Sequence, residues 1–253
     1  VEYLLLTVCF FRLFTKMKNN NFIIVGSSGG IGTQLVADLA KNNRLLLGYH
    51  NEKPNDRLPN TISAPVDARS FDSVASLIEL GKSEFEKIDG IVSLPGSVIL
   101  KPAHLVTEDE FNSTIEINLK SAFAIVRASG KFLTDCSIVL MSTAVTNLGL
   151  SNHELIVSAK AGIEAMVRSA SVSYSRKLLR FNAIAPGLVD TPLTKKITGN
   201  PAALEISKKM HILNRIGKPK DISNMIKFLI NPDNNWITGQ TFTVDGGLSS
   251  TKR

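Results

Sequence analysis

Cysteine is scarce in this sequence, which holds only Cys9 and Cys136. Two cysteines cannot build the disulfide framework of a small secreted domain, so we expect the protein in a reducing cytoplasm. Internal repeats and low-complexity tracts are also lacking, and nothing in the composition indicates disorder. With 253 residues, of which 43% are hydrophobic and 20% charged, the chain can bury a large core. We expect a single domain.

Basic runs are absent as well, although the formal net charge is +7. The lysines and arginines are scattered and are not interleaved with aromatic residues, as they are in many nucleic-acid-binding proteins. We therefore predict no nucleic-acid partner and interpret the charge as a solvated basic surface. Such a surface would also attract a phosphorylated cofactor.

No apolar run reaches the roughly twenty residues that span a bilayer. The apolar stretch over residues 1–14 is too short, and no basic n-region precedes it. We interpret residues 1–16 as an N-terminal extension of doubtful status, and residues 17–253, beginning at Met17, as the folded domain. The alternative for the extension is an interfacial membrane anchor. We otherwise expect no membrane partner.

The stretch from Phe22 to Leu35 predicts a strand, a tight turn and a helix. Four apolar residues form the strand, and apolar residues at intervals of four mark the buried face of the helix. Gly26, Gly30 and Gly32 lie at the join, where a turn that admits a diphosphate to its backbone N–H groups has no room for Cβ atoms. A plain surface turn would give the same residues, but the strand and helix around it favour dinucleotide binding.

Strands and helices alternate along the rest of the chain. Between the strands lie helices with one apolar face, such as the helix that begins with the capping pair Thr107 and Glu110. This alternation predicts one α/β domain, Rossmann-like and doubly wound, with a mostly parallel sheet flanked by helices. Short apolar runs predict the further strands at residues 45–49, 62–66, 91–94, 138–141, 179–185 and 241–244.

The residues that follow the second predicted strand bear on the choice of cofactor. An acidic side chain there would hold the ribose hydroxyls of adenosine and repel a 2′-phosphate. This sequence has His50 instead, with Ser27 in the glycine turn and Lys53 nearby. We therefore predict NADP(H) in preference to NAD(H). Glu52 keeps NAD(H) as the alternative, and an ordinary polar loop is the purely structural interpretation.

With these features the chain resembles the short-chain dehydrogenase/reductase family over residues 21–249. The resemblance implies hydride transfer between a nicotinamide and a carbonyl or hydroxyl group of a small-molecule substrate. It also implies a homotetramer or homodimer. The segments that resemble family motifs are the cofactor turn at 26–32, the asparagine helix at 116–119, half of the catalytic helix motif at 158–162, the nicotinamide segment at 180–191 and the C-terminal third at 215–247.

The resemblance also assigns residues to a site, in which no metal is expected. Its catalytic residues would be Asn118, Thr143 and Lys160, and Lys160 would also hold the nicotinamide ribose. The other expected cofactor contacts are Gly26, Ser27, Ser28, Gly30, Ile31, Gly32, His50, Asp67, Gly96, Pro186, Gly187, Val189 and Thr191.

The sequence departs from the family pattern at its most important position. Family members have a tyrosine four residues before the catalytic lysine, where this chain has Ile156, and none of its three tyrosines lies within the turn before Lys160. The family's serine falls on Thr143, which keeps the hydroxyl. Of the family's Asn-Asn-Ala-Gly motif, here residues 93–96, only Gly96 remains.

Because isoleucine cannot donate a proton, three accounts of the site compete. In the first, His153, seven residues before Lys160 and so on the same helix face, supplies the proton; its structural alternative is a polar residue of the first helical turn. In the second, the protein binds NADP(H) without turnover, as a regulatory or scaffold protein. In the third, a group of the substrate itself, or a water held by Thr143, supplies or accepts the proton. The apolar spacing in residues 194–212 indicates a helical wall, but it does not identify a substrate.

Overall fold

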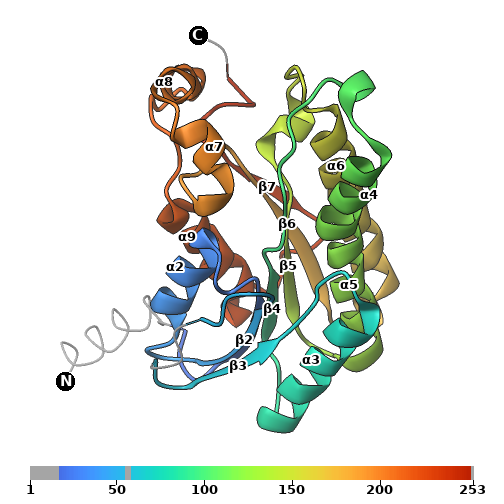
Figure 1. The fold of residues 1–253 in the computed structure, drawn as a ribbon. Helices are drawn as coiled ribbons and strands as arrows, with labels where there is room; N and C mark the ends of the chain where they lie inside the picture. Colours follow the sequence, from blue (N-terminus) through green and yellow to red (C-terminus); the bar gives the residue numbers. More distant parts are fainter. Residues whose placement is uncertain (1–16, 55–57, 252–253) are drawn as a thin grey trace, which may run out of the picture.

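A computed structural model describes residues 17–54 and 58–251 (Figure 1). The predicted N-terminal extension, residues 1–16, lies outside the described residues. Within the described part, no helix combines the length and the apolar composition that crossing a bilayer requires.

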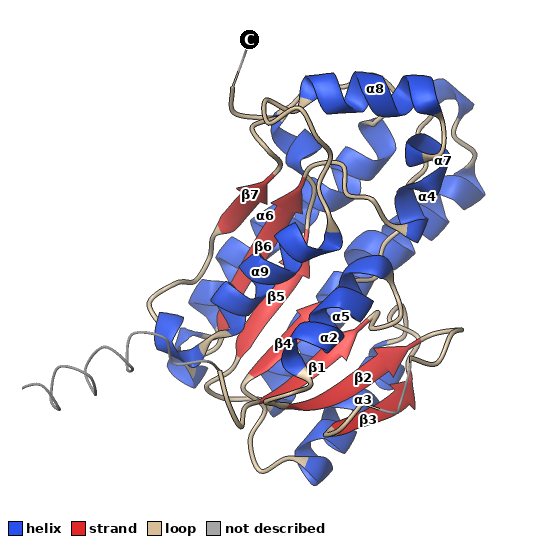
Figure 2. Cartoon of the chain, turned by 90° about the vertical axis from the view of Figure 1, so that its left-hand side faces the viewer, coloured by secondary structure: helices blue, strands red, loops and turns tan. Residues whose placement is uncertain are grey.

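Seven parallel strands form one sheet in the order β3-β2-β1-β4-β5-β6-β7 (Figure 2). Consecutive strands first move outward from β1 to β3 and then start again from β4 on the other side of β1. This reversal is the signature of a doubly wound sheet, so the predicted fold is confirmed. The strands are β1 (Asn21–Val25), β2 (Arg44–Tyr49), β3 (Thr61–Pro65), β4 (Gly90–Ser93), β5 (Ser137–Met141), β6 (Arg180–Pro186) and β7 (Thr241–Val244).

Helices cover both faces of the sheet, as Figure 1 shows. One apolar cluster joins α2 and α9 to the sheet, and the other joins α3, α5 and α6 to its opposite face. The α-helices, with the π-helical turn η2, are α2 (Gly30–Leu39), α3 (Phe71–Glu84), α4 (Glu108–Ile115), η2 (Glu116–Lys120), α5 (Ser121–Phe132), α6 (Glu154–Ser173), α7 (Lys195–Thr198), α8 (Pro201–Met210) and α9 (Pro219–Ile230). The short 3-10 turns are η1 (Ala103–Leu105), η3 (Ala144–Asn147), η4 (Ser175–Lys177), η5 (Pro192–Thr194) and η6 (Pro232–Asn234).

Both layers follow from the sequence pattern. Strands β4 and β5 are buried along their whole length and β1 is buried from Phe22 to Val25, which explains their continuous apolar runs. Thr107 and Glu110 form the predicted capping box at the start of α4. The predicted helical wall between β6 and α9 is built from α7 and α8, which lie together above the carboxyl ends of the strands (Figure 1).

Candidate active site

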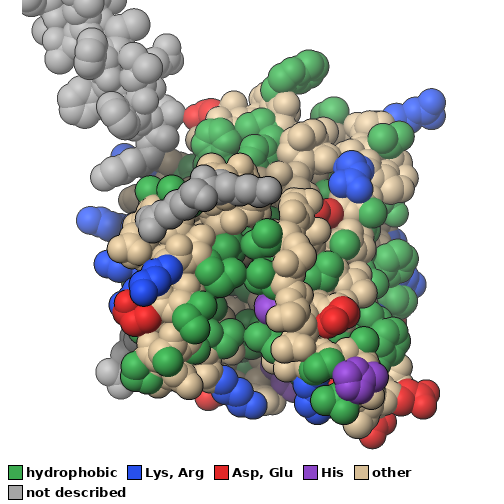
Figure 3. Space-filling view, turned by 90° about the horizontal axis from the view of Figure 1, so that it is seen from above, with side chains coloured by type: hydrophobic (Ala, Val, Ile, Leu, Met, Phe, Trp, Pro, Cys, Tyr) green, Lys and Arg blue, Asp and Glu red, His purple; other side chains and the backbone are tan. Residues whose placement is uncertain are grey.

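A cavity of about 480 Å³ opens at the carboxyl ends of the central strands. It extends from Ile31 at the start of α2 and the loop that follows β4 to the helical wall formed by α7 and α8. In the view from above, a hollow on this face lies among apolar side chains (Figure 3). The order in which strands are added to the sheet reverses between β1 and β4. Doubly wound proteins bind their ligands at the carboxyl ends of the strands at such a point.

The glycine turn lies next to Ile31, which lines the first end of this region. Gly26 has a φ of +81°, which L side chains rarely adopt. A Cβ on Gly32 would lie 2.3 Å from the carbonyl oxygen of Gly26, and one on Gly30 would lie 3.0 Å from Thr191. The backbone at the N-terminus of α2 is therefore bare on the side of the turn. Such a cradle fits the diphosphate of a dinucleotide.

The two serines of the turn lie in different surroundings. Ser27 is buried, and its hydroxyl donates to the carbonyl of Gly48 over 3.0 Å, so this hydroxyl serves the turn itself. The half-buried Ser28 donates to the carbonyl of Glu52 over 2.6 Å and ties the turn to the loop after β2. His50, in the same loop, is exposed. Of the three side chains predicted to favour a 2′-phosphate, Ser27 is buried, whereas those of His50 and Lys53 are exposed.

Asp67, predicted to contact the adenine, lies after β3 and forms a double hydrogen bond with Arg69. The Nε and Nη2 atoms of Arg69 lie 2.9 and 3.0 Å from the two carboxylate oxygens. These bonds lower the pKa of Asp67 to about 2. The carboxylate is 38% exposed and remains accessible to a ligand at this end of the sheet.

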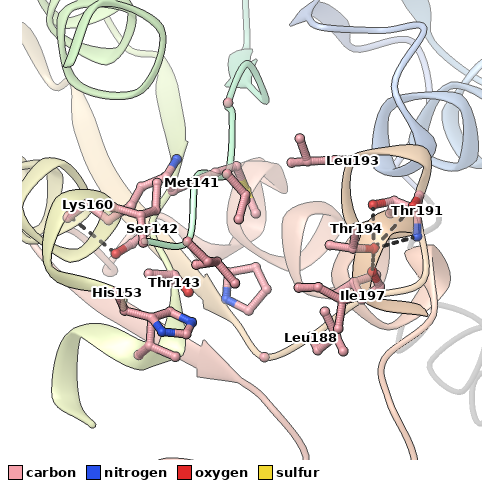
Figure 4. A pocket seen from close by; sticks show the side chains of 18 of the residues that line it. Met141, Ser142, Thr143, His153, Lys160, Leu188, Thr191, Leu193, Thr194 and Ile197 are labelled. Carbon is pink, nitrogen blue, oxygen red and sulfur yellow. Dashed lines mark hydrogen bonds between the residues drawn. The ribbon is translucent and has the colours of Figure 1, made fainter. Parts of the chain in front are cut away.

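The other end of the cavity gathers the residues of the predicted catalytic centre (Figure 4). Thr143, two residues after the end of β5, lines the cavity, and its hydroxyl makes no hydrogen bond within the described residues. Ile156, where a family tyrosine would lie, is buried and also lines the cavity. Lys160, one turn further along α6, donates to the carbonyl of Met141 over 2.8 Å. Burial lowers the pKa of this lysine to about 8.

Asn118 lies in η2, the π-helical turn between α4 and α5. π-helical turns are rare in proteins, and many of those that do occur lie at functional sites. The buried amide donates to the Thr114 carbonyl and to the Ser97 hydroxyl, and its oxygen accepts the Ser97 backbone N–H. A Cβ on Gly96 would lie 3.2 Å from this oxygen, which explains why glycine remains at the end of the altered 93–96 motif.

His153 also lines the cavity, on the side of Thr143 (Figure 4). It precedes α6, because Asn152 has a φ of 65° and so cannot belong to the helix. The helix therefore begins at Glu154, one residue after His153, which the sequence interpretation had placed within it. The Nδ1 atom of His153 lies 2.8 Å from the carbonyl oxygen of Ser151, which fixes the proton on that nitrogen. Within the described residues, Nε2 has no partner.

Two residues of this region were missed by the sequence interpretation. Glu164 accepts hydrogen bonds from Ser142 over 2.5 Å and from Thr146 over 2.7 Å, and so holds the chain on both sides of Thr143. His211, at the end of α8, is buried; its Nδ1 lies 2.6 Å from the Ser207 carbonyl oxygen. No spacing motif marks either residue.

His211 also connects the helical wall to the nicotinamide segment predicted at 180–191. Its Nε2 accepts the backbone N–H of Leu188 over 3.3 Å. A Cβ on Gly187 would lie 2.7 Å from that same nitrogen, so glycine is needed there for the contact. The segment around Pro186 and Gly187 therefore lies between the end of β6 and the wall, where it lines the cavity together with Val189 and Thr191.

Replacing Lys160 with methionine is expected to change how stability depends on pH. Because the lysine pKa is about 8 in the folded chain and 10.5 as a free side chain, the unfolded chain binds more protons between these values. Wild-type stability should therefore rise with pH in this window, by up to about 3 kcal/mol, and the variant should lack this rise. Urea unfolding of both proteins without cofactor, near pH 7 and near pH 10, measures this change in the free energy of unfolding. A difference in stability that is independent of pH would contradict the expectation.

A doubly wound sheet with a bare glycine cradle at its first strand–helix turn defines a dinucleotide-binding domain of the Rossmann type. A family model described as enoyl-(acyl carrier protein) reductase matches residues 25–249. The chain belongs to the short-chain dehydrogenase/reductase family, whose members include many oxidoreductases, so an oxidoreductase that uses a nicotinamide cofactor is implied.

Named relatives agree with this assignment. The chain is 31% identical to a hydroxynaphthalene reductase-like protein of Metarhizium anisopliae, over 89% of this chain and 93% of that protein. It is 27% identical to a 3-oxoacyl-(acyl carrier protein) reductase of Thermotoga maritima, over 92% and 99%. A solved short-chain dehydrogenase/reductase from Mycobacterium ulcerans has the same fold, with a TM-score of 0.85 at 20% identity over 92% and 91% of the two chains.

Proposed function

We propose that this protein is an NADP(H)-dependent reductase or dehydrogenase in which His153 replaces the missing tyrosine as the proton donor. A bound nicotinamide dinucleotide supplies or accepts the hydride. The observation that carries the proposal is the presence of an imidazole in the same cavity as Thr143 and Lys160, with its Nδ1 proton held by a backbone carbonyl. This arrangement resembles the general way in which a catalytic histidine is oriented by a second group.

The residues of the site have separate proposed roles. The Thr143 hydroxyl positions the substrate oxygen by a hydrogen bond. His153 acts as the acid in its imidazolium form, with a proton on both ring nitrogens, and gives the Nε2 proton to that oxygen during reduction. In the opposite direction Nε2 accepts the proton. Lys160 holds the nicotinamide ribose, and Asn118 supports the loop after β4 through its bonds to Ser97.

The glycine turn is proposed to hold the diphosphate. The steric cradle formed by Gly26, Gly30 and Gly32 supports this role, because bare backbone at a helix N-terminus is what an anion requires. Ser28 and the exposed His50 are proposed to face the adenosine ribose and its 2′-phosphate. Asp67 is proposed to contact the adenine.

The test is consumption of NADPH in the presence of a panel of ketones and aldehydes, followed by chiral analysis of the alcohol product. Calorimetry on the same preparation measures cofactor binding separately. Steady turnover supports the proposal. Tight NADPH binding without turnover of any carbonyl or alcohol would instead favour the regulatory or scaffold alternative, which the reductase names of the relatives do not favour.

Replacing His50 with glutamate is expected to shift the cofactor preference toward NADH. A carboxylate at the end of β2 would repel the 2′-phosphate and accept the ribose hydroxyls. Loss of one hydrogen bond to a charged group corresponds to about 10- to 100-fold in the ratio of the dissociation constants for NADPH and NADH. Fluorescence titration of both cofactors measures the ratio.

His104→Glu is the matched control for this variant. It makes the same change of residue at an exposed histidine that does not line the cavity. Its ratio of dissociation constants should equal that of the wild type. An unchanged ratio in His50→Glu would remove His50 from the proposed cofactor contacts.

A further inference from the structure

Beyond the catalytic residues, most of the side chains that line the cavity are apolar, and below they are called the apolar wall, as distinct from the helical wall of α7 and α8. The side chains of the apolar wall come from four separate segments: the loop after β4, the η3 region, the η5 turn and the end of α8. Within the described residues, neither an aspartate, a glutamate nor an arginine lines the cavity. The principal wall residues are Val98, Leu100, Val145, Leu150, Leu193 and Met210.

The few titratable groups that line the cavity already have assignments. Lys160 donates to the Met141 carbonyl at the floor. Both ring nitrogens of His211 are bonded to backbone groups, so this imidazole offers no free donor to a ligand. His153 is the proposed proton donor. No cation in the described wall is therefore left to pair with a second charged group on a substrate.

The polar groups proposed to take part in the reaction lie at one end, whereas the hydroxyls of Thr191 and Thr194 on the other side are hydrogen-bonded to each other, and Thr194 also donates to the Val189 carbonyl. Thr143 and His153 lie together beside α6, whereas Leu193 and Ile197 line the opposite side (Figure 4). A carbonyl oxygen placed at Thr143 would direct the remainder of its molecule toward the apolar wall. Burial of an ionised group there, without a partner, is strongly unfavourable.

Apolar side chains continue to the mouth of the cavity. Leu193 is 52% exposed and Met210 38%, and both Val98 and Leu100 are 37% exposed. An apolar body seated between them would remove this surface from water, which favours binding in proportion to the area covered. The wall thus selects against charge and for apolar area at once.

We propose that the substrate is a neutral carbonyl compound with a bulky apolar body and no ionised group, oriented with its oxygen toward Thr143 and its body against the wall of Val98, Leu100, Leu193 and Met210. This inference rests on the proposed function for the identity of the reacting group. Its reduction adds a hydride to the carbonyl carbon and a proton to the oxygen, so that NADPH is oxidised to NADP⁺ and the carbonyl becomes an alcohol.

A matched pair of compounds tests the inference. Methyl 4-acetylbenzoate and 4-acetylbenzoate have the same reacting ketone, but only the second has a carboxylate, which lies at the end of the molecule remote from the ketone. We expect kcat/KM for the ester to exceed that for the acid by at least about 100-fold, since an unpaired charge in an apolar site costs several kcal/mol. Values within threefold of each other would overturn the proposal.

A charge placed in the wall gives the reciprocal test. Leu193→Arg adds a guanidinium at a half-exposed wall position, and should lower the ester-to-acid ratio at least about tenfold by pairing with the carboxylate. Leu178→Arg is the matched control, because Leu178 is 67% exposed and does not line the cavity. Its ratio should remain that of the wild type. An unchanged ratio in both variants would contradict the assigned wall.

Binding measurements separate this inference from the proposed function. Calorimetric titration of both compounds into protein saturated with NADP⁺ does not require turnover. Tighter binding of the ester by tenfold or more supports the substrate class, even where no reduction is seen and the proposed function fails. Equal or tighter binding of the acid overturns the substrate class, even where reduction of both compounds is observed.

Discussion

Replacing His153 with phenylalanine is expected to lower kcat for carbonyl reduction by about 10²- to 10⁴-fold, the usual contribution of a positioned general acid. Phenylalanine keeps an aromatic ring at this position but has no group that can donate a proton. The dissociation constant for NADPH should change little, because His153 lines the cavity on the side of Thr143 and does not belong to the glycine turn proposed to hold the diphosphate. Steady-state kinetics and fluorescence titration measure the two effects separately.

The control for this variant is His104→Phe, which changes an exposed histidine outside the cavity. It should retain wild-type turnover and cofactor affinity. Unchanged turnover in His153→Phe would instead favour the account in which the substrate itself, or a water held by Thr143, manages the proton. Comparing the turnover of His153→Phe with that of the wild type therefore distinguishes proton donation by His153 from proton transfer by the substrate or a water.

A phenol at position 156 offers a second route to the same conclusion. Ile156 lines the cavity one turn before Lys160, so Ile156→Tyr directs a hydroxyl toward the substrate oxygen near Thr143. Introduced into the His153→Phe variant, it should restore at least about tenfold of the lost rate, since a general acid is again present. Failure of the double variant to exceed His153→Phe, in folded protein that still binds NADPH, would mean that the rest of the site does not support this chemistry.

The fold could be predicted from the sequence because its strongest signals are local. The third strand was predicted at residues 62–66 and is found at Thr61–Pro65, because a short run of apolar and β-branched residues marks a strand with little help from distant contacts. The glycine turn was predicted from its residues alone, and the φ of +81° at Gly26 gives the physical reason.

The fine structure of the site could not be predicted, because it depends on partners that lie far apart in the sequence. Glu164 contacts Ser142, twenty-two positions earlier, and His211 contacts Leu188, twenty-three positions earlier. Neither residue belongs to a recognisable spacing. The pairing of Asp67 with Arg69 was missed for a different reason: it is local, but nothing in the sequence shows whether an exposed arginine turns back onto its neighbour.

The start of α6 shows how one backbone angle can change a functional interpretation. The sequence placed His153 within the helix, on the face of Lys160, whereas the left-handed Asn152 ends the preceding turn and leaves His153 just before the first helical residue. The imidazole is consequently bonded to the Ser151 carbonyl rather than fixed by helix packing alone. This bond orients the ring and leaves Nε2 without a partner among the described residues, which supports the proposed role of His153 in proton transfer.

Replacing Gly32 with alanine is expected to abolish tight cofactor binding, with a loss of at least about 100-fold in affinity for NADPH. The new Cβ would lie 2.3 Å from the carbonyl oxygen of Gly26 and 2.8 Å from the carbonyl carbon of Ser27. Both neighbours are backbone atoms, so no side chain can rotate away. The N-terminus of α2 must then move from the turn, and the free energy of unfolding should fall by about 1 to 3 kcal/mol, as it does for other overpacked sites.

Gly29→Ala is the matched control, three residues away in the same turn. Gly29 has φ −69° and ψ 165°, which any residue adopts, and its Cβ would meet only the Gly26 oxygen at an ordinary 3.4 Å. Its backbone N–H is retained, so NADPH affinity should stay within a few-fold of the wild type. Calorimetric titration with NADPH compares the affinities of the two variants, and thermal unfolding compares their stabilities. Equal NADPH affinity in Gly32→Ala and Gly29→Ala would show that the cradle does not hold the diphosphate, and the proposed cofactor site would have to be abandoned.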